Sequence, residues 1–216
     1  MKSAPKTSPA FTLLELLVVI ALTAALAGAL GLALRAPTGA VALQAAQGTL
    51  AGLCGAARAR AAFAGVNARL VVGADPADAD GALRWWQIVQ EDPANPGCWL
   101  AAGGGFWLPR GTYAVPPPGG AVPGVPTWPS TRRSTAFSSP STALTINGAP
   151  AGLFYFVQFT PRGTTGGGSL VLAAGRPAAD PTGLPCALEN PDDLRGVLLR
   201  TSGGVTLLND AGAFAP

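Results

Sequence analysis

Residues 11–34 form the longest apolar pattern in the chain. The run contains a single charge, Glu15, among mainly leucine, valine, isoleucine, alanine and glycine. As a helix it would measure about 36 Å at 1.5 Å per residue, which is enough to cross the hydrocarbon core of a bilayer. We therefore predict a transmembrane helix over residues 11–35. A cleaved secretory signal, suggested by small residues near Ala33, is the alternative, although its apolar region is normally about 7 to 15 residues long.

An amphipathic pattern follows this run after a break at Pro37 and Gly39. Apolar residues recur on one helical face at Leu43, Ala46, Leu50, Cys54, Ala57 and Ala61. Polar residues occupy the other positions, namely Gln44, Gln47, Thr49, Arg58 and Arg60. This pattern predicts a helix over residues 36–66 whose alanine and leucine stripe packs against a sheet.

Beyond residue 66 the period changes to short apolar runs separated by turn residues. The predicted strands lie at Ala68–Gly73, Leu83–Asp92, Leu153–Thr160, Ser169–Gly175 and Leu194–Asp210, the last with a hairpin turn at Ser202–Gly204. Between them, residues 103–152 contain 18 glycines and prolines and are expected to form a loop-rich insertion, ordered or mobile. We therefore predict an α+β protein, in which the long N-terminal (transmembrane) helix packs on a C-terminal, β-rich domain over residues 67–216 that is mainly an antiparallel sheet.

Composition and charge bear on which partners the chain could bind and on its orientation in a membrane. Hydrophobic residues make up 49% of the chain and charged residues 12%. The net charge is +3, and removal of Lys2 and Lys6 would lower it to +1. That is too little to argue for a nucleic-acid partner by charge alone. These two lysines precede the apolar run and only Arg35 follows it closely, which favours a single-pass protein with a cytoplasmic N-terminus and a periplasmic or otherwise extracytoplasmic body.

Candidate chemistry is sparse. Histidine is absent, which removes Ser-His and Cys-His nucleophile pairs and weighs strongly against a hydrolase. We expect no enzyme, no catalytic residue and no cofactor. The three cysteines show no metal-type spacing. If the body is exported, Cys98 and Cys186 in turn-rich sequence are a possible disulfide, with the connectivity open. The loop Asp75–Gly81 alternates carboxylates as calcium loops do, but it departs from the helix-loop-helix pattern and is interpreted as a strand connection.

Five tryptophans and several arginines allow a functional and a structural interpretation. The tryptophans, at positions 85, 86, 99, 107 and 128, suit a sugar- or partner-binding platform, with core packing expected for at least half of them. Adjacent Trp85 and Trp86 must face opposite sides of a strand. The arginines at positions 110, 132, 133 and 162 suit DNA contact or, as we expect, a solvated surface.

The N-terminus resembles a known motif. A short basic leader over residues 1–10 precedes FTLLELLVVIALTAALAGAL, with phenylalanine first and glutamate fifth. This is similar to the prepilin cleavage and methylation motif of type IV pilins and type II secretion pseudopilins. The resemblance implies a prepilin peptidase that cuts between Ala10 and Phe11 and methylates Phe11, and assembly in which Glu15 meets the Phe11 amine of a neighbouring subunit. Ala10 departs from the glycine usual before the cut.

The body resembles the H-type minor pseudopilins and the related FimT-like minor pilins through Ala56–Phe63, Phe159–Leu172 and Leu198–Leu208. The resemblance implies the pilin fold, other pilin or pseudopilin subunits as partners, and a location in the cytoplasmic (inner) membrane. The expected function is that of a minor pseudopilin, a structural subunit of the type II secretion pseudopilus. Alternatives are a minor type IV pilin in pilus assembly or DNA uptake, and a membrane-tethered β-domain with a binding or enzymatic role.

Overall fold

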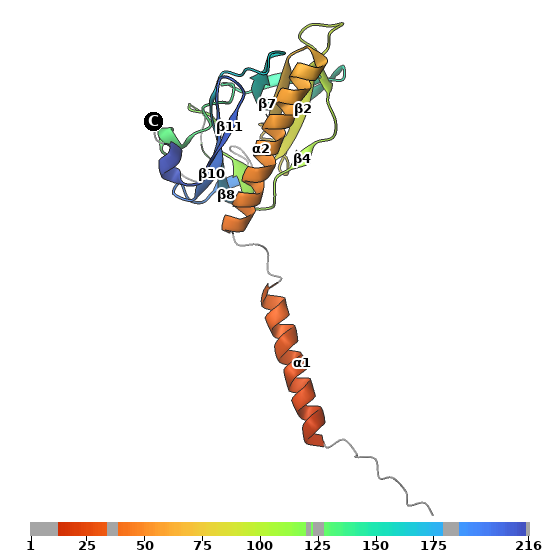
Figure 1. The fold of residues 1–216 in the computed structure, drawn as a ribbon, viewed down its shortest axis with the longest axis vertical. Helices are drawn as coiled ribbons and strands as arrows, with labels where there is room; N and C mark the ends of the chain where they lie inside the picture. Colours follow the sequence, from red (N-terminus) through yellow and green to blue (C-terminus); the bar gives the residue numbers. More distant parts are fainter. Residues whose placement is uncertain (1–12, 34–38, 120–121, 123–127, 179–185, 215–216) are drawn as a thin grey trace, which may run out of the picture. The chain divides into compact units, whose positions relative to one another are not determined.

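The protein is an α+β chain in the computed structural model, which describes residues 13–33, 39–119, 122, 128–178 and 186–214 (Figure 1). It divides into two compact units, residues 1–37 and residues 38–216. The first unit contains helix α1 (Leu13–Ala33), and the second contains helix α2 (Gly39–Ala64) and all the strands. The predicted fold class, an N-terminal apolar helix followed by a β-sheet domain, is confirmed.

Two helices are long or apolar enough to raise the question of a membrane span. By length and composition alone α2 qualifies, and the segment Leu13–Ala27 of α1 counts as a shorter apolar helix. α2, however, buries nine of its residues within the second unit, so the core of that unit accounts for its apolar stripe. In α1 the large hydrophobic side chains from Leu13 to Leu26 are all exposed within the structure, on every side of the helix.

The first sheet has six strands in the order β1-β7-β6-β3-β2-β4, and β1 also pairs with β2. Five of them therefore form a closed ring, with β4 attached outside it to β2. The strands are β1 (Ala68–Gly73), β2 (Trp85–Glu91), β3 (Trp99–Ala101), β4 (Phe106–Trp107), β6 (Thr142–Ile146) and β7 (Ala149–Phe159). All pairs are antiparallel except β3 with β6, which meet in parallel at Trp99 and Ile146.

The second sheet runs β11-β10-β8-β5, with β9 also paired to β8. Its strands are β5 (Thr112–Ala114), β8 (Gly168–Pro177), β9 (Cys186–Leu188), β10 (Leu194–Leu199) and β11 (Val205–Leu208), and 3-10 turns lie at Ser130–Arg132 and Ala211–Phe214. The predicted hairpin turn between β10 and β11 is present: Gly203 has φ +77°, a left-handed conformation that glycine adopts without strain.

Residues 103–152 differ most from expectation. They were predicted as a loop-rich insertion, yet they contribute β4 and β6 to the first sheet, β5 to the second and the start of β7. The new strands are two to five residues long, too short for alternation to show against the surrounding glycine and proline. One signal was available: Asn147 and Gly148 both have positive φ and form the turn between β6 and β7, as the Asn-Gly pair favours.

The core lies beneath α2, which contacts strands of both sheets (Figure 1). The predicted stripe is confirmed, because all six of its residues, from Leu43 to Ala61, are fully buried. They pack with Leu70, Trp86 and Phe159 of the first sheet and with Leu172 of the second, among others. Burial of this shared apolar surface holds the helix and the two sheets together.

Gln47 was expected on the polar side of α2, and this expectation was wrong. It is 3% exposed, and its Nε2 donates to the carbonyl oxygens of Gly196 and Leu208, each at 2.8 Å, and to Asn209 Oδ1 at 3.2 Å. A buried amide is tolerated when its hydrogen bonds are made. Gln47 thus ties α2 to the β10–β11 hairpin.

We expect Gln47→Leu to lower the free energy of unfolding by about 1–3 kcal/mol, because it leaves two carbonyl groups of the hairpin without the amide donor. Gln44→Leu, on the exposed side of the same helix, is the matched control and should change stability by less than about 0.5 kcal/mol. Urea unfolding of the full chain in detergent micelles measures both. Equal effects would show that the Gln47 hydrogen bonds contribute little.

Candidate functional site

The candidate site for assembly is the beginning of α1. Glu15 lies in the first turn of this helix, where a carboxylate interacts favourably with the helix dipole. Ala10 and Phe11, the residues of the predicted cleavage, lie outside the described residues. Glu15 therefore lies near the beginning of the described part of an apolar helix.

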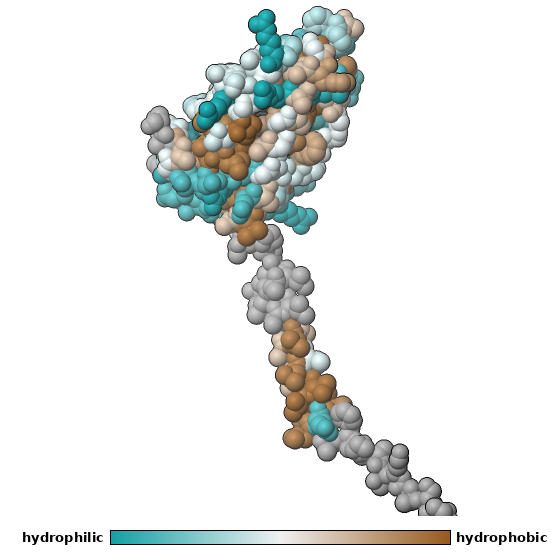
Figure 2. All heavy atoms as spheres, in the orientation of Figure 1, coloured by the Kyte–Doolittle hydropathy of each residue, from teal (hydrophilic) through white to brown (hydrophobic). Residues whose placement is uncertain are grey.

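The rest of α1 offers apolar contact in every direction. Leu13 is 82% exposed within the structure, and leucine, valine and isoleucine residues follow around the helix at 47% exposure or more. Figure 2 shows hydrophobic residues along the described part of this helix. The polar Thr23 satisfies its hydroxyl locally, since Oγ1 donates to the Ile20 carbonyl at 2.9 Å. A helix that is apolar all round is covered by lipid or by other helices.

The possible disulfide between Cys98 and Cys186 is not present in the structure, where Cys54, Cys98 and Cys186 are all free thiols. Cys98 is half-buried just before β3 of the first sheet, whereas Cys186 is buried at the start of β9 in the other sheet system. Burial raises the pKa of the Cys54 and Cys186 thiols to about 12. A protonated, enclosed thiol is a poor nucleophile, so these two cysteines serve packing.

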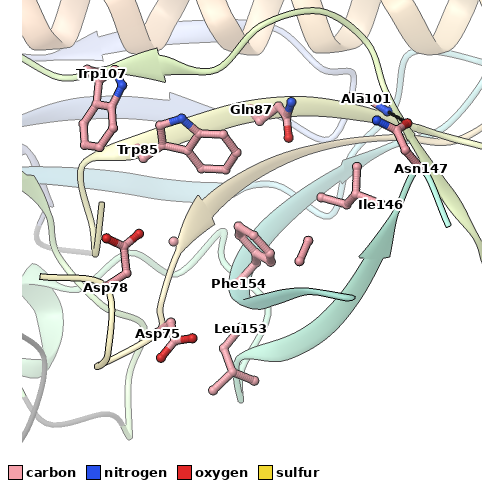
Figure 3. Close-up of a pocket in the computed structure, with 12 residues that line it drawn as sticks. Asp75, Asp78, Trp85, Gln87, Ala101, Trp107, Ile146, Asn147, Leu153 and Phe154 are labelled. Atoms are coloured by element: carbon pink, nitrogen blue, oxygen red, sulfur yellow. Dashed lines mark hydrogen bonds between the residues drawn. The ribbon is translucent and has the colours of Figure 1, made fainter. Parts of the chain in front are cut away.

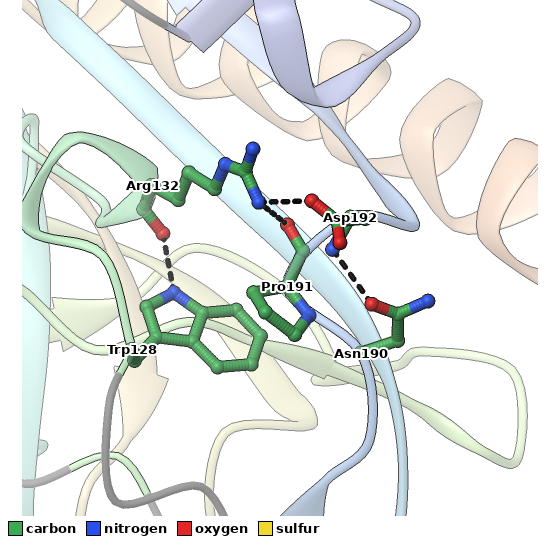
Figure 4. A network of polar contacts seen from close by, with 5 residues as sticks. All are labelled: Trp128, Arg132, Asn190, Pro191 and Asp192. Atoms are coloured by element: carbon green, nitrogen blue, oxygen red, sulfur yellow. Dashed lines mark hydrogen bonds and ion pairs between the residues drawn. The ribbon is translucent and has the colours of Figure 1, made fainter.

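Two of the arginines considered for DNA contact, Arg132 and Arg133, interact with other parts of the body. Arg132 forms an ion pair with Asp192 and donates from Nη1 to the Pro191 carbonyl at 2.8 Å, while its own carbonyl accepts from Trp128 Nε1 at 2.8 Å (Figure 4). This network fastens the turn at residues 130–132 to the segment before β10. Burial lowers the pKa of the neighbouring Arg133 guanidinium. Arg132 therefore has a structural role within the body.

The tryptophans divide between core and surface as expected. Trp86 is fully buried under α2, and Trp99 and Trp128 are also buried. Trp85, on the other face of β2, is half-buried against Phe154, with ring centroids 6.2 Å apart. Trp107 is 53% exposed on β4 and lies opposite Trp85 across the strand pair. Trp85 and Trp107 are thus the two that remain available for contact.

Sequence reasoning missed the role of Arg69. Its guanidinium carbon lies 4.0 Å from the ring centre of Trp99 and 3.9 Å from that of Phe156, and its Nε donates to Gln158 Oε1 at 3.0 Å. Two aromatic faces and an amide hold the cation inside the strand ring. Alternation in β1 places Arg69 on the face away from α2, but Trp99 reaches it only through the pairing of β3 with β2, which in turn pairs with β1.

Among the comparisons with known proteins, the family match lies at the N-terminus. Residues 6–31 match the model of the prokaryotic N-terminal methylation motif. No curated protein sequence matches the chain significantly. Among solved structures, two of the minor pseudopilin EpsH from the type II secretion system of Vibrio cholerae are similar. One is 11% identical with a TM-score of 0.42, covering 77% of this chain and 96% of that one. The other is 15% identical with a TM-score of 0.41, covering 78% and 94%. The chain thus carries the prokaryotic, prepilin-type methylation motif at the head of an apolar helix that precedes an α+β body.

Proposed function

We propose that this protein is a minor pseudopilin, a structural subunit that enters the pseudopilus of a type II secretion system through its N-terminal helix. The observation that carries the proposal is the methylation motif over residues 6–31, with Glu15 in the first turn of an all-apolar helix. In this account residues 1–10 are a leader, a prepilin peptidase cuts between Ala10 and Phe11, and the new Phe11 amine is methylated.

The helix then has two successive environments. Before assembly, α1 spans the cytoplasmic membrane as a single-pass anchor, and the body lies on the extracytoplasmic side. In the filament, the apolar surface of α1 packs against the helices of neighbouring subunits. Both environments suit side chains such as Leu14, Val18 and Leu22, which are 72%, 47% and 59% exposed within the structure.

Glu15 supplies specificity to that packing. A carboxylate in an apolar surrounding is costly unless a cation meets it. The methylated amine of Phe11 on a neighbouring subunit is the cation we propose. Because the carboxylate and the amine each lie at one fixed position along the helix, their pairing sets the axial position of each subunit relative to the next.

The proposed role is structural and involves no catalysis by this chain. Absence of histidine leaves no Ser-His or Cys-His pair to act as a nucleophile, in keeping with that role. The motif itself is shared with type IV pilins, so a minor pilin is the second candidate.

Deletion of the gene in the native host distinguishes the two candidates. The pseudopilin role predicts that secreted proteins accumulate inside the cell, that pili remain, and that the wild-type gene restores secretion. Normal secretion together with lost pili or lost DNA uptake would instead assign the protein to a type IV pilus.

A further inference from the structure

The body contains a pocket of about 550 Å³ at one end of the ring of strands (Figure 3). Its floor is apolar, formed by the buried side chains of Phe154 and Ile146. Trp85 and Trp107 lie side by side along it, and Asp75 and Asp78 line it from the loop that follows β1 (Figure 3). The size lies within the range of ligand-binding pockets in proteins.

The charged residues that line this pocket are negative. Among the described residues that line it, Asp75 and Asp78 are the only charged ones. Each carboxylate uses Oδ1 to accept a backbone N–H of its own turn, from Ala77 and Gly81 respectively, both at 2.9 Å. No hydrogen bond joins either Oδ2 to another described residue, and Asp78 Oδ2 lies against the backbone of Gly81.

The tryptophans reinforce this preference. The face of an indole ring is electrostatically negative and attracts cations, most strongly when water is partly excluded. Trp85 is half-buried and Trp107 is 53% exposed. The Trp107 ring already has one cation beside it, since the Arg84 guanidinium carbon lies 5.9 Å from its centre. Carboxylates and aromatic faces together favour an organic cation. A metal ion is a poorer match, since no group of three or more candidate metal ligands occurs among the residues that the structure describes.

We propose that this pocket binds the side chain of a lysine or arginine carried on an extended segment of a partner protein. The volume exceeds that of one basic side chain, which leaves room for its neighbours. Trp107 belongs to β4, which is the edge strand next to β2. Both residues of β4 are exposed, so an extended segment can lie along this edge. The site lies wholly in the second unit and does not depend on assembly through α1.

Saturation-transfer NMR with the full chain in polyoxyethylene detergent micelles tests the proposal. The probes are the peptide acetyl-Gly-Ser-Lys-Ser-Gly-amide, its arginine counterpart, its acetyl-lysine counterpart and cellobiose. We expect the two cationic peptides to bind and the acetyl-lysine peptide to bind at least about fivefold more weakly, because it has the same shape without the charge. Raising the salt concentration should weaken the cationic peptides alone.

Asp75→Asn with Asp78→Asn is the matched variant, because asparagine Oδ1 still accepts the turn N–H while the charge is lost. It should weaken both cationic peptides by at least about fivefold. Glu189→Gln with Asp193→Asn removes two exposed charges that do not line the pocket and should leave binding unchanged. Equal binding of the acetyl-lysine peptide, preference for cellobiose, no effect of the pocket variant, or no binding of any cationic peptide would each overturn the proposal.

Discussion

Glu15→Leu is expected to reduce incorporation of the protein into filaments by at least about tenfold. In the proposed assembly the mutation leaves the Phe11 amine of a neighbouring subunit without its carboxylate, and breaking a buried ion pair typically costs about 3–5 kcal/mol. The measurement is the fraction of the protein recovered in sheared or cross-linked filaments from cells that also express the other subunits. Glu15→Gln, which keeps the shape but removes the charge, should fail similarly.

Two controls separate this effect from loss of membrane insertion. Glu15→Leu makes α1 more apolar, so the variant should still fractionate with membranes. Thr23→Val removes a polar group from the same helix, where the hydroxyl donates to the Ile20 carbonyl, and should assemble normally. Wild-type incorporation of Glu15→Leu would contradict the assigned role of the carboxylate.

Trp86→Ala should destabilise the body by about 3–5 kcal/mol, the range for removing a large buried aromatic side chain. Trp86 is fully buried, its ring centroid lies 5.8 Å from that of Phe137, and its strand pairs with β1 at Val72. Its Nε1 has no hydrogen-bond partner among the described residues, so packing is its contribution. Urea unfolding of the full chain in micelles, followed by the remaining tryptophan fluorescence, gives the difference.

The adjacent residue provides the control. Trp85→Ala removes the same side chain from the other face of β2, where it is only half-buried at the pocket, and should cost no more than about half as much. A loss for Trp85→Ala equal to that for Trp86→Ala would mean that the two faces of β2 contribute alike, against the burial described here.

Elements with many repeats of their pattern were predictable from sequence. The α2 stripe was visible because it recurs over several helical turns, and β1 coincides with the predicted Ala68–Gly73. The strands β4, β5 and β6 were not predicted, because two to five residues carry too little alternation. The Asn147–Gly148 turn was a usable local signal, since both positions favour the left-handed conformation that a tight hairpin needs.

Contacts between elements distant in sequence could not be predicted from local sequence patterns. The sequence around Gln47 is typical of a solvent-facing glutamine, because its hydrogen-bond partners lie in the β10–β11 hairpin, far along the chain. The pocket likewise joins Asp75, Trp85, Trp107 and Phe154 from four separate segments, which the pairing of β4 with β2, β2 with β1 and β1 with β7 brings together. Glu15 was identifiable because its motif is contiguous in the chain.

The most direct test of the central claim is intact-mass and N-terminal peptide mass spectrometry of the membrane-bound protein from its native host. The account predicts a chain that begins at Phe11 and carries one methyl group on its amine. A chain that begins at Met1, or one cut near Ala33, would contradict it, because neither could present the Phe11 amine to Glu15 of a neighbouring subunit.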